Sequence, residues 1–373
     1  MKIEAIDLYH ISMTLVAPFV TSFGPQQRRD SLILTLHAGG LSGWGECVAT
    51  NTPGYSYETV GTAWHILGDF LIPAVLGRTI QEPWELPSML SSVRGHPLAK
   101  ATLDQAVWDA TAQRDGLSLA EKLCQPYEEA PRDRVSVGVS IGIQPSIEET
   151  LDVIRAHLDE GYGRIKLKIK PGHDLTLARA ARQEFPDVPI MLDANSAYTL
   201  DDAPLFQAMD ELDLLMLEQP LGYEDIYDHS RLRPQIKTPL CLDESIHSAD
   251  HGRLALALGA CDIINIKPAR VGGWTEARRL HDLCREHDVP VWCGGMLESG
   301  VGRAGQLALA SLPGFTLPGD ISATDRYYHH DITAPFTLNA EDSTIDVPRG
   351  PGLGIEIDHD RLAAVTVRKE SFT

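Results

Sequence analysis

Charged residues at regular spacing are the feature of this sequence that most directly indicates chemistry. Lys168, Asp193, Glu218, Asp243 and Lys267 follow one another at intervals of 25, 25, 25 and 24 residues. A leucine or isoleucine precedes each of them, near the end of a short apolar stretch. Because side chains alternate across a strand, an apolar residue that faces outward leaves its neighbour facing inward. We therefore expect the five charges on one side of five successive strands.

Three carboxylates on neighbouring strands, with no His or Cys at the same level, predict an all-oxygen metal site. Hard cations take such sites, and Mg²⁺ keeps open positions for water or substrate. Mn²⁺ is the alternative ion. The spacing therefore predicts Asp193, Glu218 and Asp243 as metal ligands.

The two lysines are expected to face each other across the ring of strands, because their strands stand four places apart among eight. A carboxylate substrate on the metal would expose its α-carbon to Lys168 on one side and to Lys267 on the other. This arrangement suits removal of the α-proton to give an enediolate, with a lysine as base and Lys166 as a neighbouring charge. The alternative interpretation is a structural ring of ion pairs, since buried charges need partners.

Short apolar strands alternate with amphipathic helical segments from Val135 onward, which is the pattern of βα units and a parallel sheet. Eight such strands close most naturally into a (β/α)₈-type barrel, whose active site lies at the C-terminal ends of the strands. The expected strands are Val135–Ile141, Arg164–Ile169, Ile190–Ala194, Leu214–Gln219, Leu240–Glu244, Ile263–Pro268, Val291–Gly294 and Phe315–Pro318.

The chain before this barrel has the pattern of a small α+β unit. Its expected strands are Ile3–His10, Leu32–His37 and Gly43–Cys47, and helical patterns follow around Tyr57–Leu76 and Leu98–Arg114. The stretch after the barrel lacks further βα units, and we expect it to pack back on the first unit. The predicted organisation is therefore 1–127, 128–325 and 326–373.

Composition excludes several classes of protein. The 373 residues carry 32 Lys and Arg against 52 Asp and Glu, a net charge of −20, which argues against a nucleic-acid partner. No apolar run is long enough to span a membrane, and the first residues lack the pattern of a secretory signal. The six cysteines include no C-x-x-C pair, which suits free thiols in a reducing compartment. We expect a cytoplasmic protein.

Several short motifs accompany the five charged residues. They are Ser22-Phe23-Gly24, Gly43-Trp44-Gly45-Glu46-Cys47, Lys166-Leu167-Lys168, Leu192-Asp193-Ala194-Asn195, Glu218-Gln219-Pro220, Asp243-Glu244-Ser245, Lys267-Pro268, Gly294–Gly300 and Leu317–Asp320. Together they resemble the lysine-type members of the enolase superfamily over essentially the whole chain. Within it, the sequence is similar to the subgroup of o-succinylbenzoate synthase and N-succinylamino acid racemase, the latter also called N-acylamino acid racemase.

This resemblance implies an α/β fold with a modified TIM barrel of the (β/α)₇β type. An N-terminal α+β capping domain, completed by the C-terminal segment, would close over the barrel mouth. It implies Lys168 and Lys267 as acid and base on opposite faces, Lys166 beside them, and Mg²⁺ on the three carboxylates. The substrate-binding residues it implies are Asn195, Ser140, Arg270, Phe19, Ser22, Phe23, Tyr55, Gly295 and Met296.

The activity that the resemblance implies acts on a small-molecule carboxylate. One outcome is a lyase reaction, the dehydration that forms o-succinylbenzoate on the menaquinone route. The other is an isomerase reaction, the racemisation of an N-succinyl or N-acyl amino acid, and the presence of Arg270 three residues after Lys267 favours it. Glu244 has the opposite parity to Asp243 and is expected to orient a lysine. The resemblance also implies a homo-oligomer, with octamers known in the subgroup.

Other functions stay open at this point. Dipeptide epimerases and muconate lactonising enzymes share the lysine series, although the Pro318–Ser322 stretch lacks the signature of the epimerases. A Schiff-base lyase would use Lys168 or Lys267 without a metal. A barrel that only binds a carboxylate is disfavoured, because two opposed buried amines are costly for binding alone.

Overall fold

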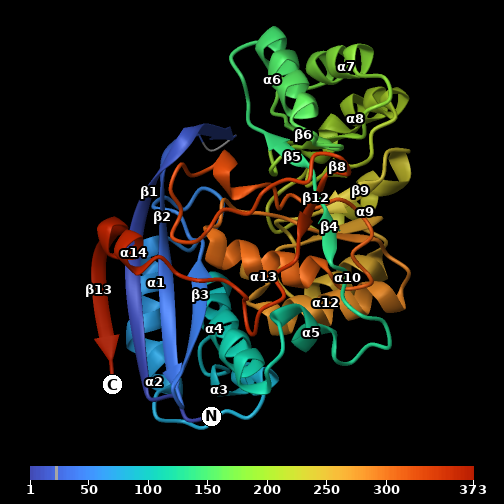
Figure 1. Cartoon of the computed structure of the whole chain (residues 1–373). Helices are drawn as coiled ribbons and strands as arrows, with labels where there is room; N and C mark the ends of the chain where they lie inside the picture. The colour runs from blue at the N-terminus through green and yellow to red at the C-terminus, as the bar shows by residue number, and fades with distance from the viewer. Residues whose placement is uncertain (22–23) are drawn as a thin grey trace.

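Sheets of two kinds organise the protein (Figure 1). The structure is a computed structural model that describes residues 1–21 and 24–373. In these described residues, an antiparallel sheet has the strand order β13-β1-β2-β3, and a parallel sheet has the order β11-β10-β9-β8-β7-β6-β5. The parallel order follows the chain, as expected for consecutive βα units. The predicted α/β class is confirmed.

The antiparallel sheet and its helices form the N-terminal unit. Its strands are β1 (Ala5–Thr21), β2 (Gly24–Ala38), β3 (Leu41–Cys47) and, from the other end of the chain, β13 (Thr366–Phe372). β1 and β2 are longer than predicted, because they continue as a paired ribbon beyond the buried part of the sheet. The helices are α1 (Val60–Ile66), the π-helical turn Leu67–Leu71, α2 (Ile72–Val75), α3 (Leu86–Met89), α4 (Pro97–Asp115) and α5 (Leu119–Cys124).

The parallel sheet curves into a barrel with helices outside it (Figure 1). Its strands are β5 (Val139–Ile141), β6 (Ile165–Lys168), β7 (Ile190–Asp193), β8 (Leu217–Glu218), β9 (Leu240–Leu242), β10 (Ile263–Ile266) and β11 (Val291–Cys293). The helices are α6 (Ile147–Asp159), α7 (Leu175–Glu184), α8 (Ala203–Met209), α9 (Tyr227–Leu232), α10 (Ala249–Leu258), α11 (Pro268–Val271), α12 (Trp274–Glu286) and α13 (Gly300–Ala310).

The eighth predicted strand, Phe315–Pro318, is not a regular strand. Phe315 forms an isolated parallel bridge with Val291, and Gly319 forms one with Val137 on the other side. Pro318 has no N–H to donate to a ladder, which limits the pairing of this stretch. The segment still closes the ring between β11 and β5, so the barrel is of the (β/α)₇β kind.

The first predicted barrel strand, Val135–Ile141, is divided in the structure. Its first part, β4 (Arg134–Ser136), pairs antiparallel with β12 (Thr344–Asp346), and only β5 joins the barrel. At the division, a side chain on Gly138 would come within 2.4 Å of the Arg164 guanidinium. A single strand was therefore the wrong prediction for this stretch.

The C-terminal segment returns to the N-terminal sheet, as expected. It contains α14 (His359–Val365) and ends in β13, which pairs antiparallel with β1 from Ile6 to Ile11. Three hydrophobic clusters lie in the described part of the chain: one between the antiparallel sheet and α4, a larger one around the barrel strands, and a small one formed by Met191, Met216, Cys241, Ile263 and Trp292 of the barrel. The boundaries at residues 127 and 325 stay a prediction.

Buried polar side chains fasten the N-terminal unit to the barrel. Asp104 on α4 accepts hydrogen bonds from the backbone N–H and the hydroxyl of Thr275, at 3.0 and 2.7 Å. Glu46 on β3 accepts from the backbone N–H and the hydroxyl of Ser299, at 3.1 and 2.7 Å. Because these groups are buried, losing either partner would leave an unsatisfied polar group. The contacts hold the two units in one relative position.

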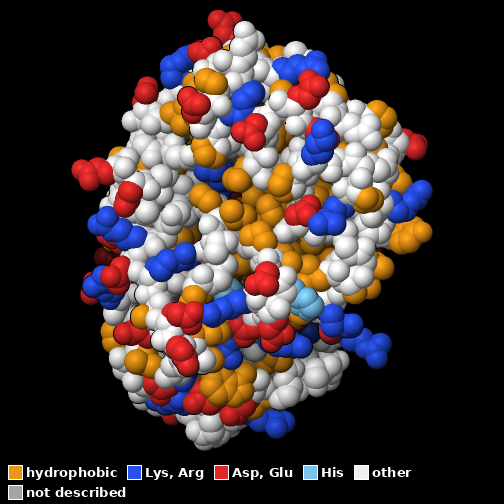
Figure 2. Space-filling view, turned by 90° about the vertical axis from the view of Figure 1, so that its right-hand side faces the viewer, with side chains coloured by type: hydrophobic (Ala, Val, Ile, Leu, Met, Phe, Trp, Pro, Cys, Tyr) orange, Lys and Arg blue, Asp and Glu red, His pale blue; other side chains and the backbone are white. Residues whose placement is uncertain are grey.

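No helix in the described ranges is both long and apolar enough to cross a membrane. On the face shown in Figure 2, hydrophobic side chains gather near the centre, and charged side chains of both signs surround them.

Asp104 predicts a pH dependence of stability. Burial raises its pKa to about 7, from a usual value of 3.8. The folded protein therefore binds this proton more tightly than the unfolded chain does, and stability falls as the pH rises through the window between the two values. Asp104→Asn should remove a slope of up to about 1.4 kcal/mol per pH unit there.

Urea unfolding between about pH 4 and pH 8 measures this slope. Asp159→Asn changes an exposed carboxylate at the end of α6 and is the matched control, which should keep the wild-type slope. An unchanged slope in Asp104→Asn would contradict the prediction.

Candidate active site

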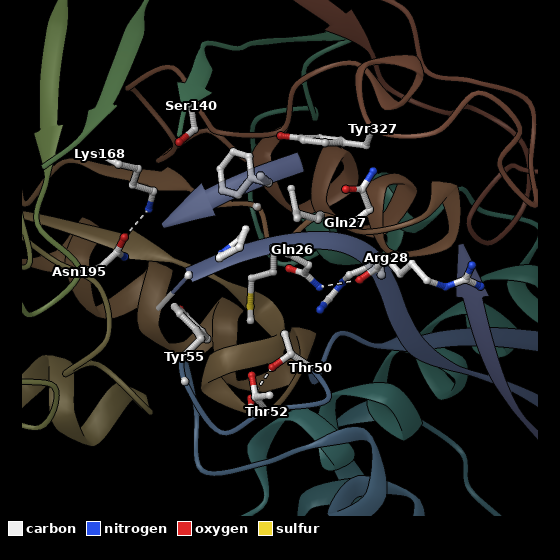
Figure 3. Close-up of a pocket in the computed structure, with 18 of the residues that line it drawn as sticks. Gln26, Gln27, Arg28, Thr50, Thr52, Tyr55, Ser140, Lys168, Asn195 and Tyr327 are labelled. Atoms are coloured by element: carbon white, nitrogen blue, oxygen red, sulfur yellow. Dashed lines mark hydrogen bonds between the residues drawn. The ribbon is translucent and has the colours of Figure 1, made fainter. Parts of the chain in front are cut away.

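A cavity of about 320 Å³ lies where the barrel strands end and segments of the N-terminal unit cover them (Figure 3). Of the residues predicted from the sequence, those that line it are Phe19, Tyr55, Ser140, Lys166, Lys168, Asn195, Lys267, Gly295 and Met296. The predicted Ser22 and Phe23 lie outside the described residues. The structure thus brings together side chains from the first unit and from β5, β6, β10 and the segments after β7 and β11.

Strand alternation explains how the lysines reach the cavity. On β6, Lys166 and Lys168 point to the inner side, while Leu167 between them packs in the hydrophobic core. β6 pairs with β7 so that Lys168 is opposite Asp193, and Asp193 in turn is opposite Glu218 on β8. Lys168, Asp193 and Glu218 therefore lie side by side, as predicted. On the next strand Glu218 is opposite Cys241, so Asp243 lies two residues further along than equal register would place it.

Lys166 is enclosed by carboxylates. Its Nζ lies 3.1 Å from Asp193 and 3.0 Å from Glu218, and it also contacts Asp320. Burial lowers the pKa of Lys166, but these three carboxylates raise it more, so that it lies well above its usual value. An ammonium group has three N–H donors, and all three are engaged here. Lys166 is thus a fixed positive charge without a free position for a proton acceptor.

Among residues 1–21 and 24–373, Lys168 has two hydrogen-bond acceptors. Its Nζ donates to Asp193 Oδ2 at 2.6 Å and to Asn195 Oδ1 at 2.7 Å (Figure 3). Two of the three positions around the nitrogen are therefore taken, and one stays available on a side chain that lines the cavity.

Lys267 is held in the same way from the other side. Its Nζ donates to Asp243 Oδ2 at 2.8 Å and to the Tyr55 hydroxyl at 3.1 Å, and it lies 4.8 Å from the centre of the Tyr55 ring. Burial lowers the pKa of Lys267, whereas Tyr55 and surrounding carboxylates, Glu218 first, raise it above its usual value. Its strand, β10, stands four places from β6 around the barrel. Both lysines thus present one unoccupied position from opposite walls.

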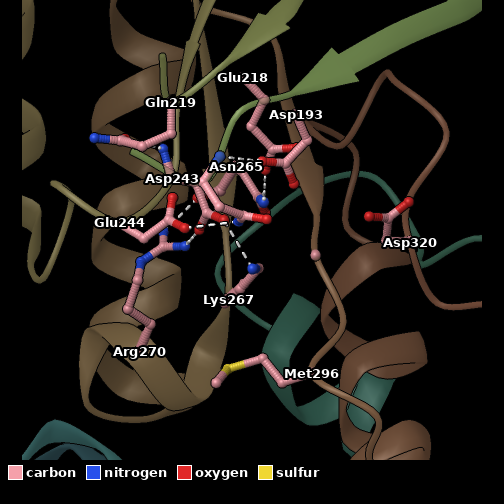
Figure 4. A network of polar contacts seen from close by, with 12 residues as sticks. Asp193, Glu218, Gln219, Asp243, Glu244, Asn265, Lys267, Arg270, Met296 and Asp320 are labelled. Carbon is pink, nitrogen blue, oxygen red and sulfur yellow. Dashed lines mark hydrogen bonds and ion pairs between the residues drawn. The ribbon is translucent and has the colours of Figure 1, made fainter. Parts of the chain in front are cut away.

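The three predicted metal ligands lie close to one another and to Lys267 (Figure 4). Asp193, Glu218 and Asp243 are fully buried. Burial raises the pKa of Asp193, but Lys168 and Lys166 lower it more, so that it lies below its usual value. Burial and the adjacent Asp193 raise the pKa of Glu218.

The donor set fits a hard divalent cation in type and position. It consists of carboxylate oxygens on three neighbouring strands, and Asn265 Oδ1 beside Glu218 is buried without a hydrogen-bond partner among the described residues. The carboxylates are turned toward the lysines and Arg270 instead of toward one another. Accordingly, no group of three His, Cys, Asp or Glu side chains in the described residues is arranged around a common metal position. A bound cation would compete with these ion pairs for the same oxygens.

Arg270 lies behind this layer and is not among the residues that line the cavity. Its guanidinium contacts Asp243 Oδ1 and donates to the backbone carbonyls of Ile246 and Asn265, at 2.8 and 2.5 Å. Arg270 therefore reaches Lys267 through Asp243, which both cations share.

Sequence reasoning missed several residues of the cavity. Asp320 joins Lys166 to Arg164, whose Nη1 donates to it at 2.6 Å. Its position directly after the closing segment was the available signal, but the irregular eighth strand hid its register. The other cavity residues are Gly24, Pro25, Gln26, Gln27, Arg28 and Arg29 on β2, Thr50, Asn51, Thr52 and Gly54 after β3, Leu297 after β11, and Tyr327 after α13. The residues outside β2 lie on loops, where no periodic pattern predicts which side chains face a cavity.

Comparison with known proteins decides the family. Residues 149–361 match the model for the enolase C-terminal domain-like family, and residues 5–123 match the N-terminal domain of mandelate racemase and muconate lactonizing enzyme. The chain belongs to the enolase superfamily. Enzymes of this superfamily generally depend on a divalent metal ion.

Two named proteins and one solved structure are similar to this chain over nearly their whole length. The o-succinylbenzoate synthase of Geobacillus stearothermophilus is 50% identical over 98% of this chain and 96% of its own. The N-succinylamino acid racemase of an Amycolatopsis species is 48% identical over 99% of each chain. A crystal structure of an enolase superfamily member from Listeria innocua has a TM-score of 0.94 at 40% identity, covering 100% of this chain and 99% of that one. The resemblance seen in the sequence is confirmed.

Lys166→Met tests whether this lysine is a structural charge. The change leaves Asp193, Glu218 and Asp320 without their shared ammonium group, and breaking a buried ion pair typically costs about 3–5 kcal/mol. We expect a loss of that size in the free energy of unfolding near neutral pH, measured with urea. The control Lys170→Met removes an exposed ammonium group just after the same strand and should change stability by less than about 0.5 kcal/mol. Equal losses in the two variants would contradict this role.

Proposed function

We propose that this enzyme removes the proton α to the carboxylate of a small-molecule substrate and that Lys168 and Lys267 transfer this proton. The observation that supports the proposal is the pair of lysines on opposite walls of one cavity, each held by two acceptors and each with one free position. The substrates proposed are those named for the relatives: an o-succinylbenzoate precursor, an N-succinylamino acid, or both.

The two lysines would act on opposite faces of the α-carbon. As a neutral amine, either one accepts the α-proton through its free position and gives an enediolate. For racemisation, the ammonium group on the other wall returns a proton to the opposite face. For dehydration, the same first transfer is followed by loss of the leaving hydroxyl group, which a proton from one of the ammonium groups would assist.

The remaining residues of the cavity would position the substrate. We propose Asn195, Ser140, Phe19, Tyr55, Gly295 and Met296 as contacts, together with Ser22 and Phe23. The Ser140 hydroxyl oxygen is buried and has no hydrogen-bond partner among the described residues, which suits a polar contact with substrate. Arg270 would act through Asp243 on Lys267. We propose a racemase activity because an arginine at this place after Lys267 resembles the racemase-competent members of the subgroup.

A divalent cation, Mg²⁺ or alternatively Mn²⁺, is proposed on Asp193, Glu218 and Asp243. When bound, it supplies positive charge beside the substrate carboxylate and makes the α-proton more acidic.

The surroundings of the site support three further proposals. Residues 1–127, with 326–373, would form a cap over the barrel of residues 128–325, because Phe19 and Tyr55 reach its cavity. All six cysteines are free and buried, which supports a reducing compartment and hence the cytoplasm. The route to menaquinone would be the pathway if the synthase reaction is the physiological one.

A time course of proton NMR in D₂O tests the reaction. N-succinyl-L-phenylalanine and its D-enantiomer are incubated separately with the enzyme and Mg²⁺, and with EDTA as the control. We expect loss of the α-proton signal from both enantiomers, with racemisation, only when metal is present. Lys168→Ala and Lys267→Ala should each abolish exchange mainly from one enantiomer, by about 10²- to 10⁴-fold.

Parallel assays separate the alternatives. Synthase activity without exchange would assign the dehydration alone, whereas exchange only with a dipeptide, or turnover only of a muconate, would assign one of the alternative activities. Full exchange in EDTA would indicate metal-free lysine chemistry and overturn the proposed mechanism.

Self-association is the proposed quaternary state. Tyr227 on α9 and Leu254 and Leu258 on α10 are large hydrophobic side chains exposed on neighbouring helices. Light scattering coupled to size-exclusion chromatography should give a multiple of the 40.9 kDa chain mass. A mass equal to that of one chain across the concentration range would contradict it.

A further inference from the structure

We infer that Glu244 is a positioning residue that fixes the side-chain amide of Asn195 and thereby keeps the free position of Lys168 open toward substrate. Glu244 does not line the cavity, so it would not touch the substrate. Its proposed role rests on its hydrogen bond with Asn195. The inference rests on the proposed function, since it concerns one of the two lysines that would transfer the proton.

Three buried side chains form a continuous chain of hydrogen bonds. Asn195 Nδ2 donates to Glu244 Oε1 at 2.8 Å, and Asn195 Oδ1 accepts from Lys168 Nζ at 2.7 Å. The Asn195 backbone is held as well, because its N–H donates to Asp193 Oδ1 at 2.9 Å and its φ is +42°, in the left-handed region. With the backbone fixed, the remaining freedom is rotation of the amide about its last side-chain bond.

That rotation would exchange a donor for an acceptor at Lys168. The oxygen and the NH₂ group of an amide have similar shapes, so packing alone distinguishes them poorly. A carboxylate can only accept hydrogen bonds. Glu244 therefore pairs with the NH₂ group and leaves the amide oxygen facing Lys168.

The orientation of the amide decides what remains free on the lysine. A neutral amine has two N–H bonds and one lone pair. Asp193 and the Asn195 oxygen take the two N–H bonds, which leaves the lone pair in the third position. A rotated amide would donate an N–H to that lone pair and occupy the electrons that must accept the substrate proton.

The opposite lysine does not share this arrangement. Lys267 is held by Asp243 and the Tyr55 hydroxyl, and no hydrogen bond joins it to Glu244 among the described residues (Figure 4). The negative charge of Glu244 is one of several that raise the pKa of Lys267, but its hydrogen bonds reach only Asn195 and, through it, Lys168. A change at Glu244 should therefore affect proton transfer on the Lys168 face of the substrate more than on the other. A purely structural role would affect both faces alike.

The test is Glu244→Gln, which keeps the size of the side chain and adds an N–H donor. Exchange of the α-proton is measured separately for the L- and D-enantiomers of N-succinylphenylalanine in D₂O with Mg²⁺. Lys168→Ala and Lys267→Ala show which enantiomer depends on which lysine. We expect Glu244→Gln to slow the exchange that depends on Lys168 by about 10- to 100-fold and the other exchange by less than about threefold.

Two further variants test the same inference if Glu244→Gln folds poorly. Glu244→Asp retains an acceptor-only carboxylate and should keep the ratio of the two exchange rates within about threefold of wild type. The double change Asn195→Asp with Glu244→Gln reverses the pair: the new glutamine donates, and the new carboxylate can only accept from Lys168. We expect it to restore much of the ratio that the single Glu244→Gln change disturbs.

Other results would overturn the inference. One such result is that Glu244→Gln slows exchange of both enantiomers equally, and another is that both exchanges need an equally higher Mg²⁺ concentration. Either result would mean that Glu244 supports the metal site or the fold. Unchanged rates would mean that Asn195 needs no fixing. A wild-type enzyme that neither exchanges either enantiomer nor forms o-succinylbenzoate would overturn the proposed function itself, which separates the two claims.

Discussion

The number of hydrogen-bond positions around a lysine nitrogen is the constraint on which this site depends. Lys166, Lys168 and Lys267 are buried in one layer with carboxylates, and each carboxylate offsets the cost of burying an ammonium group. Where three carboxylates surround the nitrogen, the charge is fixed. Where two acceptors surround it, one position is left for chemistry. The number of acceptors among the described residues therefore distinguishes Lys166 from the two lysines that we propose as proton-transfer groups.

The barrel and the N-terminal unit supply those acceptors in different ways. Asp193 ends β7 opposite Lys168, and Asp243 directly follows β9, so both carboxylates come from the regular part of the barrel. Tyr55, the second acceptor of Lys267, comes from a loop of the other unit. The buried contacts of Asp104 and Glu46 with the barrel then matter for the site, because they hold in place the unit that carries Tyr55.

Much of this arrangement could be predicted from the sequence because it repeats. The five charged residues recur at the length of one βα unit, and a strand has only two faces, so spacing and alternation were enough to place them on the inner side at one end of the barrel. They did not predict the shift of two residues that places Asp243 beyond Glu218. The prediction was wrong where the repeat breaks: Pro318 weakens the last strand, and the stretch from Val135 divides between two sheets. Loop residues such as Leu297 and Tyr327 carry no period and could not be placed.

By itself, the sequence determined the fold class, the order of the strands and the types of group at the barrel mouth, because those properties depend on local periodicity and composition. Only the tertiary structure decided how many acceptors each lysine has, and that Arg270 stands behind Asp243 instead of in the cavity. It also decided that Glu244 meets Asn195, although they are far apart in the chain. The reason is physical: hydrogen bonds depend on positions within a few tenths of an ångström, and such positions are set only when separate strands and loops pack together.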